Sequence, residues 1–392
     1  MKICRVSEPG LTYISSSELK LISGDWDSLL PENHPLESRK LLAIEESALP
    51  DLRFHYLLIS KNNQLAGCAY FQHFHFHAGH YDSRVLGQGP LFYLSQLLLC
   101  QETGILVCGN LFHLGTEGFF FAHPENRDAI LPIVSEMEKK WKPGAVLIKD
   151  VQQGLRHALI KSGGFSLYEQ DQVMNLEIQP HWKTFNDYLS ELGKKYRQRA
   201  NRILNSAAHL SFRILDEQEI HLRAVEMETL YGQVRQKQSL RIGSLNAAYF
   251  TNMKKALGKS FEIRAWFDES GKMLAFSSHF LHEGGQREVH YIGFDYQANE
   301  EFSLYFNILF DGVKAAIETG NPIVWFGRTG FDAKASTGAV PESNLHYFRI
   351  KNGLPAFTFK VLRKALSGKE NDNWKNRSPF RRAGQEPLLQ EV

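Results

Sequence analysis

The sequence predicts a mixed α/β protein, in which strands and helices alternate along most of the chain. Three observations support this: a strand, helix and strand pattern fills residues 287–351, the first half shows a similar order of elements, and Pro180 separates the two halves. A chain of 392 residues is too long for one ordinary hydrophobic core. We therefore expect two domains, at residues 1–180 and 181–370, and a flexible polar tail at 371–392.

The elements of the first half follow from short patterns along the chain. Residues 34–46 carry leucines among charges after a His-Pro start, and 54–60 and 65–77 flank a Lys-Asn-Asn-Gln turn as the strands of a hairpin do. The remaining elements are predicted from apolar runs and helical spacing: strands at 105–112, 119–121, 145–149 and 165–178, and helices at 128–141 and 155–161.

The second half begins with helical patterns and then repeats the order of the first. Its first elements are helices at 185–208, 219–236 and 247–257, a strand at 210–215, and a hairpin at 261–267 and 273–281. Both halves thus show a hairpin, a strand, a crossover helix and two more strands. A duplicated α/β domain would leave this order of elements.

The unit at 287–351 has the clearest pattern. Residues 289–296 alternate apolar with small or polar side chains, as a half-buried strand does. The helix after it is predicted from apolar side chains on one face of a 3.6-residue period: Phe302, Tyr305, Phe306, Leu309, Val313 and Ala316. Asn299 is expected to cap its start and Gly320 its end. Residues 323–327 and 344–351 are predicted to be the next two strands.

The amino-acid composition excludes few classes of function. A net charge of +2 argues neither for nor against a nucleic-acid partner. The cysteines form no CxxC pair and the N-terminus resembles no signal peptide, so we expect reduced thiols and a cytoplasmic protein. The uncharged run at 85–101 is interrupted by Gly, Pro and Gln, and we expect no stable membrane insertion.

The order of elements resembles the tandem acetyltransferase-type (GNAT-like) fold of the Fem peptidyltransferases and related acyltransferase-like proteins. Three segments within residues 34–366 carry the resemblance: 34–47 with the hairpin after it, the basic segment 188–204, and 324–350 with its Gly-Arg pair and Lys-containing turn. The resemblance implies two GNAT-like domains of α+β character, with mixed sheets flanked by helices. It also implies transfer of an acyl or aminoacyl group to an amine acceptor, such as a cell-envelope precursor. The alternative is a binding protein that keeps the fold without catalysis.

Donors of this family include acyl-CoA and aminoacyl-tRNA, and acyl carrier protein is a third possible donor. Acyl-CoA enzymes of the fold bind the pyrophosphate on free backbone amides at the start of the crossover helix, after a Gly-rich turn. Residues 296–301 contain no glycine and end in Glu300 and Glu301, and the first-half helix start at 123–128 contains Glu125. We therefore expect a donor held mainly by side chains, and no bound cofactor.

A basic helix offers such side chains. Lys195, Arg199 and Arg202 lie at i, i+4 and i+7, with Lys194 and Arg197 beside them. One interpretation is a surface that contacts the phosphates of a tRNA or of a carrier phosphopantetheine. The other is a solvated amphipathic helix, in which the Lys and Arg stems cover apolar edges.

Candidate catalytic residues lie around the strand at 289–296. Acyl transfer to an amine needs a group that accepts the amine proton and one that protonates the leaving group. Asp295 and Tyr291 are the candidates, although an Asp at a strand end also commonly caps the next turn. His290 and Tyr291 are expected on opposite strand faces, so only one of them would face a given neighbour.

Candidate binding residues lie on the helix and loop that follow. Tyr305 and Asn307 are on the predicted crossover helix, and Arg328 and Lys334 follow the strand at 323–327. The carboxyl ends of strands are where crossover α/β units place ligand groups, and a guanidinium there suits a carboxylate or phosphate. The alternative for Arg328 is a pairing with Asp332 or with a C-terminal helix.

Two further patterns were weighed for ligand binding. His73, His75 and His77 alternate along one strand, with His80 nearby, which could ligate zinc. The interleaved Phe71, Phe74 and Phe76 supply the core face, which favours a polar outer strand face for the histidines, and we predict no metal. The glycines of residues 109–118 could form a ligand loop or occupy tight turns and bulges.

Overall fold

The computed structural model divides the chain into two compact units. Unit 1 comprises Met1–Asp171, Arg235–Gly258 and Ser343–Gly368, and unit 2 comprises Gln172–Val234, Lys259–Glu342 and Lys369–Val392. The structure describes residues 3–6, 8–76, 80, 103–151, 155, 164–238, 241, 243–282, 284–350 and 377–381. The predicted helix at 155–161 and the uncharged run at 85–101 lie almost wholly outside these residues.

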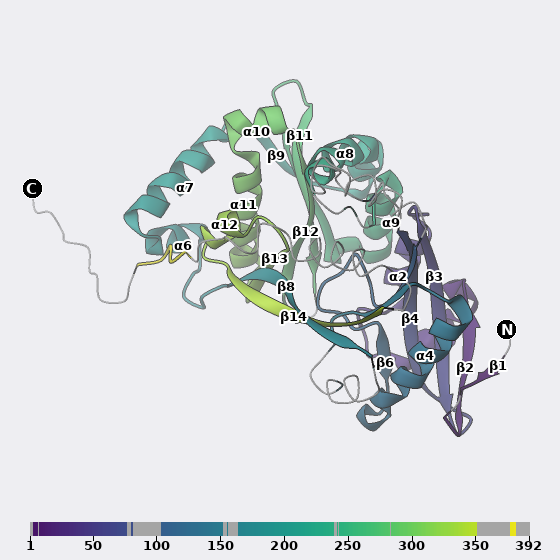
Figure 1. Ribbon diagram of the computed structural model, residues 1–392. Coiled ribbons are helices and arrows are strands. Elements are labelled where there is room, and N and C mark those ends of the chain that lie inside the picture. Colours follow the sequence, from purple (N-terminus) through teal and green to yellow (C-terminus); the bar gives the residue numbers. More distant parts are fainter. Residues whose placement is uncertain are drawn as a thin grey trace, which may run out of the picture. The chain divides into compact units, whose positions relative to one another are not determined.

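Unit 1 is a sheet with a crossover helix (Figure 1). Its strands are β1 (Ile3–Arg5), β2 (Leu11–Ser16), β3 (Leu52–Lys61), β4 (Gln64–Phe76), β5 (Thr103–Cys108), β6 (Phe119–Phe121), β7 (Ala145–Ile148) and β14 (Val340–Ile350). Its helical elements are η1 (Leu19–Leu21), α1 (Ser23–Leu29), α2 (Ser38–Glu45), η4 (Pro124–Ala129), α4 (Ile130–Trp141) and α9 (Ala247–Leu257). The predicted hairpin is present as β3 and β4, and Asn62 and Asn63 take the left-handed conformation at its turn.

Unit 2 repeats the plan around a second parallel pair of strands. Its strands are β8 (Ser166–Glu177), β9 (Ser211–Leu215), β10 (Phe261–Phe267), β11 (Met273–Leu281), β12 (Arg287–Phe294) and β13 (Ile323–Gly327). Its helical elements are α6 (Phe185–Glu191), α7 (Lys194–Ser206), α8 (Glu217–Lys237), η6 (Gly258–Ser260), α10 (Tyr296–Phe302), α11 (Leu304–Thr319) and α12 (Phe331–Ala335). The mixed α/β class predicted from the sequence is confirmed.

The core of each unit lies between its sheet and its crossover helix. In unit 1, α4 buries Ile133 and Val134 against the strands, and in unit 2, α11 buries Ile308 and Val313 in the same way. Each such side chain contributes about 1.5–3 kcal/mol to folding. Gly312 allows α11 to approach closely, since a Cβ there would lie 2.8 Å from a methyl carbon of Val289.

A predicted single helix is divided where the chain crosses over in unit 2. Ser303 takes a left-handed conformation between α10 and α11. Asp295, rather than Asn299, caps the first helix, while the side-chain oxygen of Asn299 accepts the N–H of Tyr305 at 2.9 Å and so caps the second.

The last strand of each half of the chain pairs in the unit of the other half. Met174–Glu177 of β8 run antiparallel to β13 in unit 2, and Tyr347–Ile350 of β14 run antiparallel to β7 in unit 1. Neither predicted range, 1–180 or 181–370, therefore holds all the strands of a unit. Arg235–Gly258 also belongs to unit 1, so the units are not consecutive stretches of sequence.

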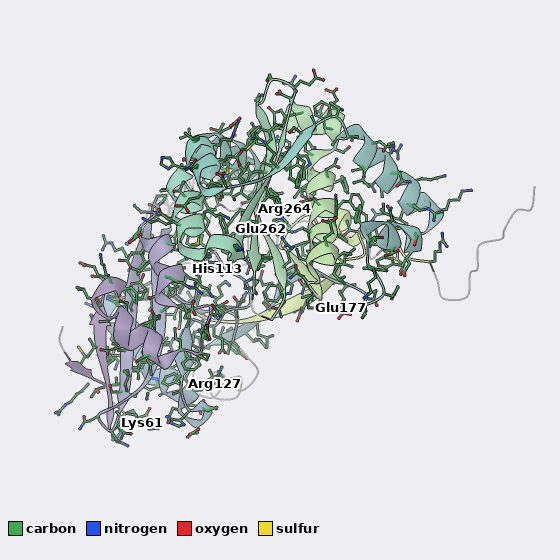
Figure 2. The ribbon with its side chains drawn as sticks, turned by 180° about the vertical axis from the view of Figure 1, so that it is seen from behind. Lys61, His113, Arg127, Glu177, Glu262 and Arg264 are labelled. Atoms are coloured by element: carbon green, nitrogen blue, oxygen red, sulfur yellow. The ribbon has the colours of Figure 1, made fainter. Side chains whose placement is uncertain are left out.

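A buried ion network lies on β10 and β12 of unit 2. The Arg264 guanidinium donates to both carboxylate oxygens of Asp311, at 2.6 and 3.0 Å, and lies 3.3 Å from Glu262 (Figure 2). Arg287, which has no exposed surface, donates to Glu262 at 2.8 Å and to Asn321 at 3.1 Å. Asn321 stands just before β13, so this guanidinium joins the starts of β12 and β13.

Among the described residues, no helix has both the length and the apolar character that a bilayer crossing requires. Within the predicted flexible tail at 371–392, residues 377–381 are described and contact unit 2. The other tail residues lie outside the described part of the chain.

The strand exchange predicts that the halves of the chain are interdependent. Residues 1–180 expressed alone lack β14, and residues 181–392 alone lack β8, so each unit would expose an unpaired strand edge. We expect each half to be aggregated or to melt without a cooperative transition, and co-expression of both halves to yield a soluble complex. Cooperative thermal unfolding of either half alone, followed by circular dichroism, would contradict this expectation.

Candidate functional site

The two parallel strands of unit 2 separate after only two residue pairs. β12 and β13 pair at Arg287 with Val324 and at Glu288 with Trp325, although β12 continues to Phe294. In unit 1, the corresponding strands β5 and β7 stay paired through four successive residues. The carboxyl ends of the parallel strands are therefore open in unit 2 and closed in unit 1, and ligands of α/β folds bind at such ends.

A β-bulge on β12 brings two candidate side chains to one face. Ser277 pairs with Ile292 and His279 with Val289, so Ser278 alone faces two residues of β12. The Ser278 hydroxyl accepts the N–H of Tyr291 at 3.0 Å and donates to its carbonyl at 3.1 Å. The rings of His290 and Tyr291 consequently lie 4.3 Å apart.

The prediction that His290 and Tyr291 point to opposite faces is therefore wrong. An extra residue in one strand breaks the alternation of side chains that a regular strand imposes.

A buried carboxylate lies on the same face. Glu288 accepts hydrogen bonds from His290 Nδ1 and His282 Nε2, each at 2.9 Å. The side chains of Glu288 and His290 are only 1% and 2% exposed. Burial alone would raise the pKa of Glu288, but the two histidines lower it below its ordinary value. Glu288 thus holds a negative charge and orients both imidazoles.

Tyr291 follows Glu288 on β12, and its hydroxyl is buried. Burial raises the pKa of Tyr291 well above its ordinary value, and Tyr231, whose ring lies 5.5 Å away, adds to the effect. The positive charge of Arg328 acts in the opposite direction and lowers this pKa. At neutral pH the Tyr291 hydroxyl is protonated and can donate.

The loop from Gly327 to Gly330 is held by a buried lysine. Gly327, Thr329 and Gly330 all take positive φ values. The Lys334 ammonium, on a residue only 4% exposed, donates to the carbonyls of Gly327 at 3.1 Å and Arg328 at 2.6 Å. Lys334, predicted as a ligand group, therefore binds the backbone that presents Arg328.

Tyr305 reaches the same loop from α11. A Cβ at Gly330 would lie 2.3 Å from the Tyr305 hydroxyl oxygen, so the glycine leaves room for this hydroxyl. Tyr291 thus lies on β12 beyond its last residue paired with β13, and the Tyr305 hydroxyl lies beside the loop that follows β13 and carries Arg328.

Two other predicted residues have structural contacts. The Asp295 carboxylate accepts the N–H groups of Gln297 and Ala298, at 2.9 and 3.2 Å, and caps α10. Burial acts to raise its pKa, but these hydrogen bonds and Lys272 lower it overall. The Asn307 amide donates to three carbonyls, those of Ile203, Phe302 and Ser303, and so joins α11 to α7.

The predicted basic stripe on α7 is split between packing and solvent. Arg199 lies over the ring of Phe306 at 4.6 Å, and this ring neighbours Tyr305 at 5.9 Å. Lys195 and Arg202 are exposed. The stripe therefore begins beside the Tyr305 side chain and continues onto the surface of unit 2.

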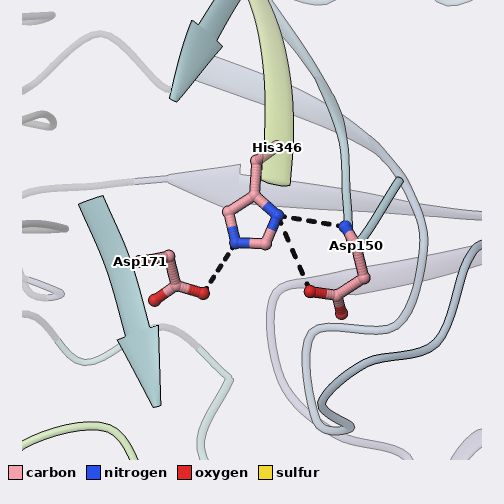
Figure 3. Close-up of side chains that lie close together, drawn as sticks. All are labelled: Asp150, Asp171 and His346. Atoms are coloured by element: carbon pink, nitrogen blue, oxygen red, sulfur yellow. Dashed lines mark hydrogen bonds and ion pairs between the residues drawn. The ribbon is translucent and has the colours of Figure 1, made fainter. Parts of the chain in front are cut away.

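Unit 1 holds a second polar cluster, which sequence reasoning missed. His346 of β14 donates from Nε2 to Asp171 at 2.6 Å, and its Nδ1 accepts the backbone N–H of Asp150 at 3.0 Å (Figure 3). The Lys149 ammonium contacts the Asp150 carboxylate. The sequence indicates only part of this cluster, because Lys149 ends the strand predicted at 145–149 and Asp150 follows it. Asp171 and His346 come from other segments.

Among the described residues, Asp150, Asp171 and His346 form the one group of three side chains whose ligand atoms are close enough for a metal. In Figure 3 the two carboxylates lie on opposite edges of the imidazole ring. Each ring nitrogen is already engaged, and Lys149 neutralises one carboxylate. His346 therefore links the Asp171 carboxylate to the Asp150 backbone through two hydrogen bonds.

The histidines weighed for zinc lie partly buried in unit 1. The rings of His73 and His75 lie 4.8 Å apart, their Nε2 atoms have no hydrogen-bond partner, and His77 lies outside the described residues. Burial, with a smaller effect of His75, lowers the pKa of His73 to about 4. In the loop at 109–118, a Cβ on Gly118 would lie 2.2 Å from a backbone nitrogen, so this glycine serves a close chain approach.

Sequence reasoning also missed Glu288, His282 and Tyr231. Glu288 stands one residue before the strand predicted at 289–296 and two before His290, so an earlier start of that strand would have placed the pair on one face. His282 and Tyr231 come from β11's end and from α8, and no local pattern links them to β12.

Comparison with known proteins yields distant likenesses. No protein-family model and no curated protein matches the chain. Three solved structures that it resembles are L-PGS from Bacillus licheniformis (11% identity, 87% of this chain and 100% of that one, TM-score 0.48), a tandem GNAT protein from the clavulanic acid biosynthesis pathway (10%, 87% and 98%, 0.46) and Saccharomyces cerevisiae N-myristoyltransferase with bound myristoyl-CoA (10%, 89% and 80%, 0.49). At these values the likenesses carry no argument about activity.

Replacing the buried carboxylate tests its contacts. Glu288→Gln removes the charge that holds His282 and His290, and we expect a loss of about 3 kcal/mol in unfolding free energy at pH 7. Because folding lowers the pKa of Glu288 from 4.5, its charge stabilises fully above that pH and loses effect as the pH falls. The difference from the parent should therefore shrink below pH 4.5 in denaturant titrations.

The matched control is Glu300→Gln, on the exposed side of α10, which should change stability by less than about 0.5 kcal/mol. An equal loss in both variants, or a Glu288→Gln difference that does not change with pH, would contradict this account.

Proposed function

We propose that unit 2 transfers an acyl or aminoacyl group to an amine acceptor. The observation that carries the proposal is the separation of β12 from β13, with Tyr291, Tyr305 and Arg328 gathered at the open ends. The ends of such strands are where α/β folds bind ligands, and the Arg328 guanidinium suits a phosphate or carboxylate.

The side chains at this site can supply the required proton transfers. The amine nucleophile must lose a proton, and a histidine oriented by a carboxylate is suited to accept it, as His290 is by Glu288. The leaving group must gain a proton, and Tyr291 is neutral and able to donate. In this proposal Glu288 and His290 take the basic role first assigned to Asp295, whose carboxylate caps α10.

The donor is one that side chains can anchor. The N–H groups of Gln297 and Ala298, the second and third residues of α10, donate to Asp295, which also places a negative charge there. A pyrophosphate would compete with that carboxylate, which disfavours acyl-CoA binding at this helix start. Arg328, Tyr305 and the exposed cations Lys195 and Arg202 favour a donor on a phosphate-bearing carrier, such as aminoacyl-tRNA or acyl carrier protein.

A non-catalytic binding protein is the second candidate. The small exposure of Glu288 and His290 favours it, because groups so deeply buried can serve to fix the strands. The two candidates differ in one measurable respect: an enzyme consumes its donor, whereas a binding protein retains it.

Incubating the protein separately with charged tRNA, acyl carrier protein and acyl-CoA, with an amine acceptor mixture, tests the proposal. We expect deacylation of a carrier-bound donor that depends on the acceptor. Binding of a donor without any product would favour the second candidate, and deacylation of acyl-CoA alone would contradict the proposed donor class.

Arg328 gives the first mutational test. Arg328→Ala should raise KM for the donor by about 10- to 100-fold, because a charge-assisted contact is lost, without lowering Tm by more than a few degrees. Arg328→Lys should restore part of the loss. Arg39→Ala, an exposed guanidinium of unit 1, is the control and should change neither quantity.

The basic stripe on α7 gives the second mutational test. The double variant Lys195→Ala/Arg202→Ala should weaken tRNA binding about tenfold at low salt, and should reduce the salt dependence of binding by one to two counterions. The control is Lys139→Ala on α4, which is similarly exposed. Equal effects of the control and the double variant, measured by fluorescence anisotropy, would contradict a role for this stripe.

A further inference from the structure

A short segment of unit 2, residues 377–381, is bound to the rest of that unit through its backbone. Residues 377–381 run along the junction between α6 and α7, where Phe380 forms an antiparallel bridge with Leu192. The N–H of Gly193 donates to the carbonyl of Pro379 at 2.8 Å, and the N–H of Arg381 donates to the carbonyl of Glu191 at 3.0 Å. These two hydrogen bonds make up the bridge and fix the register of the segment.

Phe380 fills an aromatic socket that ends at the turn after α12. Its ring lies 5.6 Å from the ring of Trp182 and 6.1 Å from that of Tyr188. Gly338 forms the far wall, since a Cβ there would lie 2.4 Å from the Phe380 ring. The Tyr188 hydroxyl donates to the carbonyl of Thr337 at 2.8 Å, which joins the socket to the same turn.

Arg377 contacts α12 near its other end. Its guanidinium donates to Asp332 at 2.9 and 3.2 Å, and also hydrogen bonds to Tyr196 of α7. The pair with Asp332 is largely exposed, so it adds little to global stability. We call residues 331–338, which comprise α12 and the turn after it, the α12 segment. Arg377 contacts this segment at Asp332 and Phe380 contacts it at Gly338, so the two side chains hold it at both ends.

The α12 segment in turn holds the loop that presents Arg328. Lys334 lies between the two clamped points, is buried, and donates to the carbonyls of Gly327 and Arg328. A shift of α12 would move the ammonium away from these carbonyls. The loop would then lose the contacts that stabilise its left-handed residues.

We infer that Arg377 and Phe380 are positioning residues for Arg328: the segment 377–381 clamps α12, and α12 fixes the loop through Lys334. The inference rests on the proposed function for its effect on catalysis, but the clamp is a property of the structure alone. The loop that presents Arg328 therefore depends on residues that follow it by about fifty positions in the sequence.

The test uses the full chain with four substitutions and hydrogen exchange. Arg377→Ala and Phe380→Ala should increase amide exchange in residues 327–338 by about tenfold or more. Phe380→Trp should restore protection, because it refills the socket with a planar ring. Arg381→Ala is the matched control, since Arg381 contributes its backbone to the contact and its side chain is exposed.

Unchanged exchange in both Arg377→Ala and Phe380→Ala would overturn the clamp. Should Phe380→Ala lower protection across the whole of unit 2, Arg377→Ala decides, because its exposed pair can be lost without unfolding. A local increase in residues 327–338 supports the inference, and equal exchange in Arg377→Ala and Arg381→Ala overturns it.

Kinetics separate this inference from the proposed function. If a donor is consumed, Arg377→Ala should raise KM for that donor severalfold while leaving kcat within about twofold, as expected for a residue that acts through Arg328. If no donor is consumed but local exchange rises, the proposed function fails and the clamp stands. If Arg377→Ala and Phe380→Ala both consume the donor with the KM of the parent protein, the positioning role is overturned.

Discussion

The early end of backbone pairing between β12 and β13 is the constraint on which the site of unit 2 depends. The buried Arg287 guanidinium joins the starts of the two strands, through its bond to Asn321. Because the strands are fixed at that end and separate at the other, their carboxyl ends must diverge. The bulge opposite Ser278 then turns His290 and Tyr291 to one face, where Glu288 already lies.

The two units use one architecture in two ways. In unit 1 the parallel strands remain paired to their ends, and charged groups close that edge: Lys149, Asp150 and His346 bond to one another and to the backbone. In unit 2 the same edge is open and carries Arg328 on a strained loop. Among the described residues, the two units thus share an order of strands and helices but differ in the pairing at this edge.

Features that follow from the local spacing of apolar residues could be predicted from the sequence. Features that depend on how one strand aligns with another could not. The spacing of apolar residues on α11, and the cluster of Arg328 and Tyr305 near strand ends, followed from short-range patterns. The bulge depends on one residue of difference between two strands, which no single segment records. The strand exchange of β8 and β14 is likewise a matter of partner choice, and Lys334 looks the same in sequence whether it meets a ligand or a backbone carbonyl.

The placement of β14 beside β7 also has a consequence for biosynthesis. The ribosome completes β7 at Ile148 but releases β14 only after Ile350, about 10 to 40 seconds later at ordinary elongation rates. During that interval the emerging N-terminal half has a strand edge with no partner, of the kind that other nascent chains can join. That edge is therefore open to wrong pairing until β14 has been made.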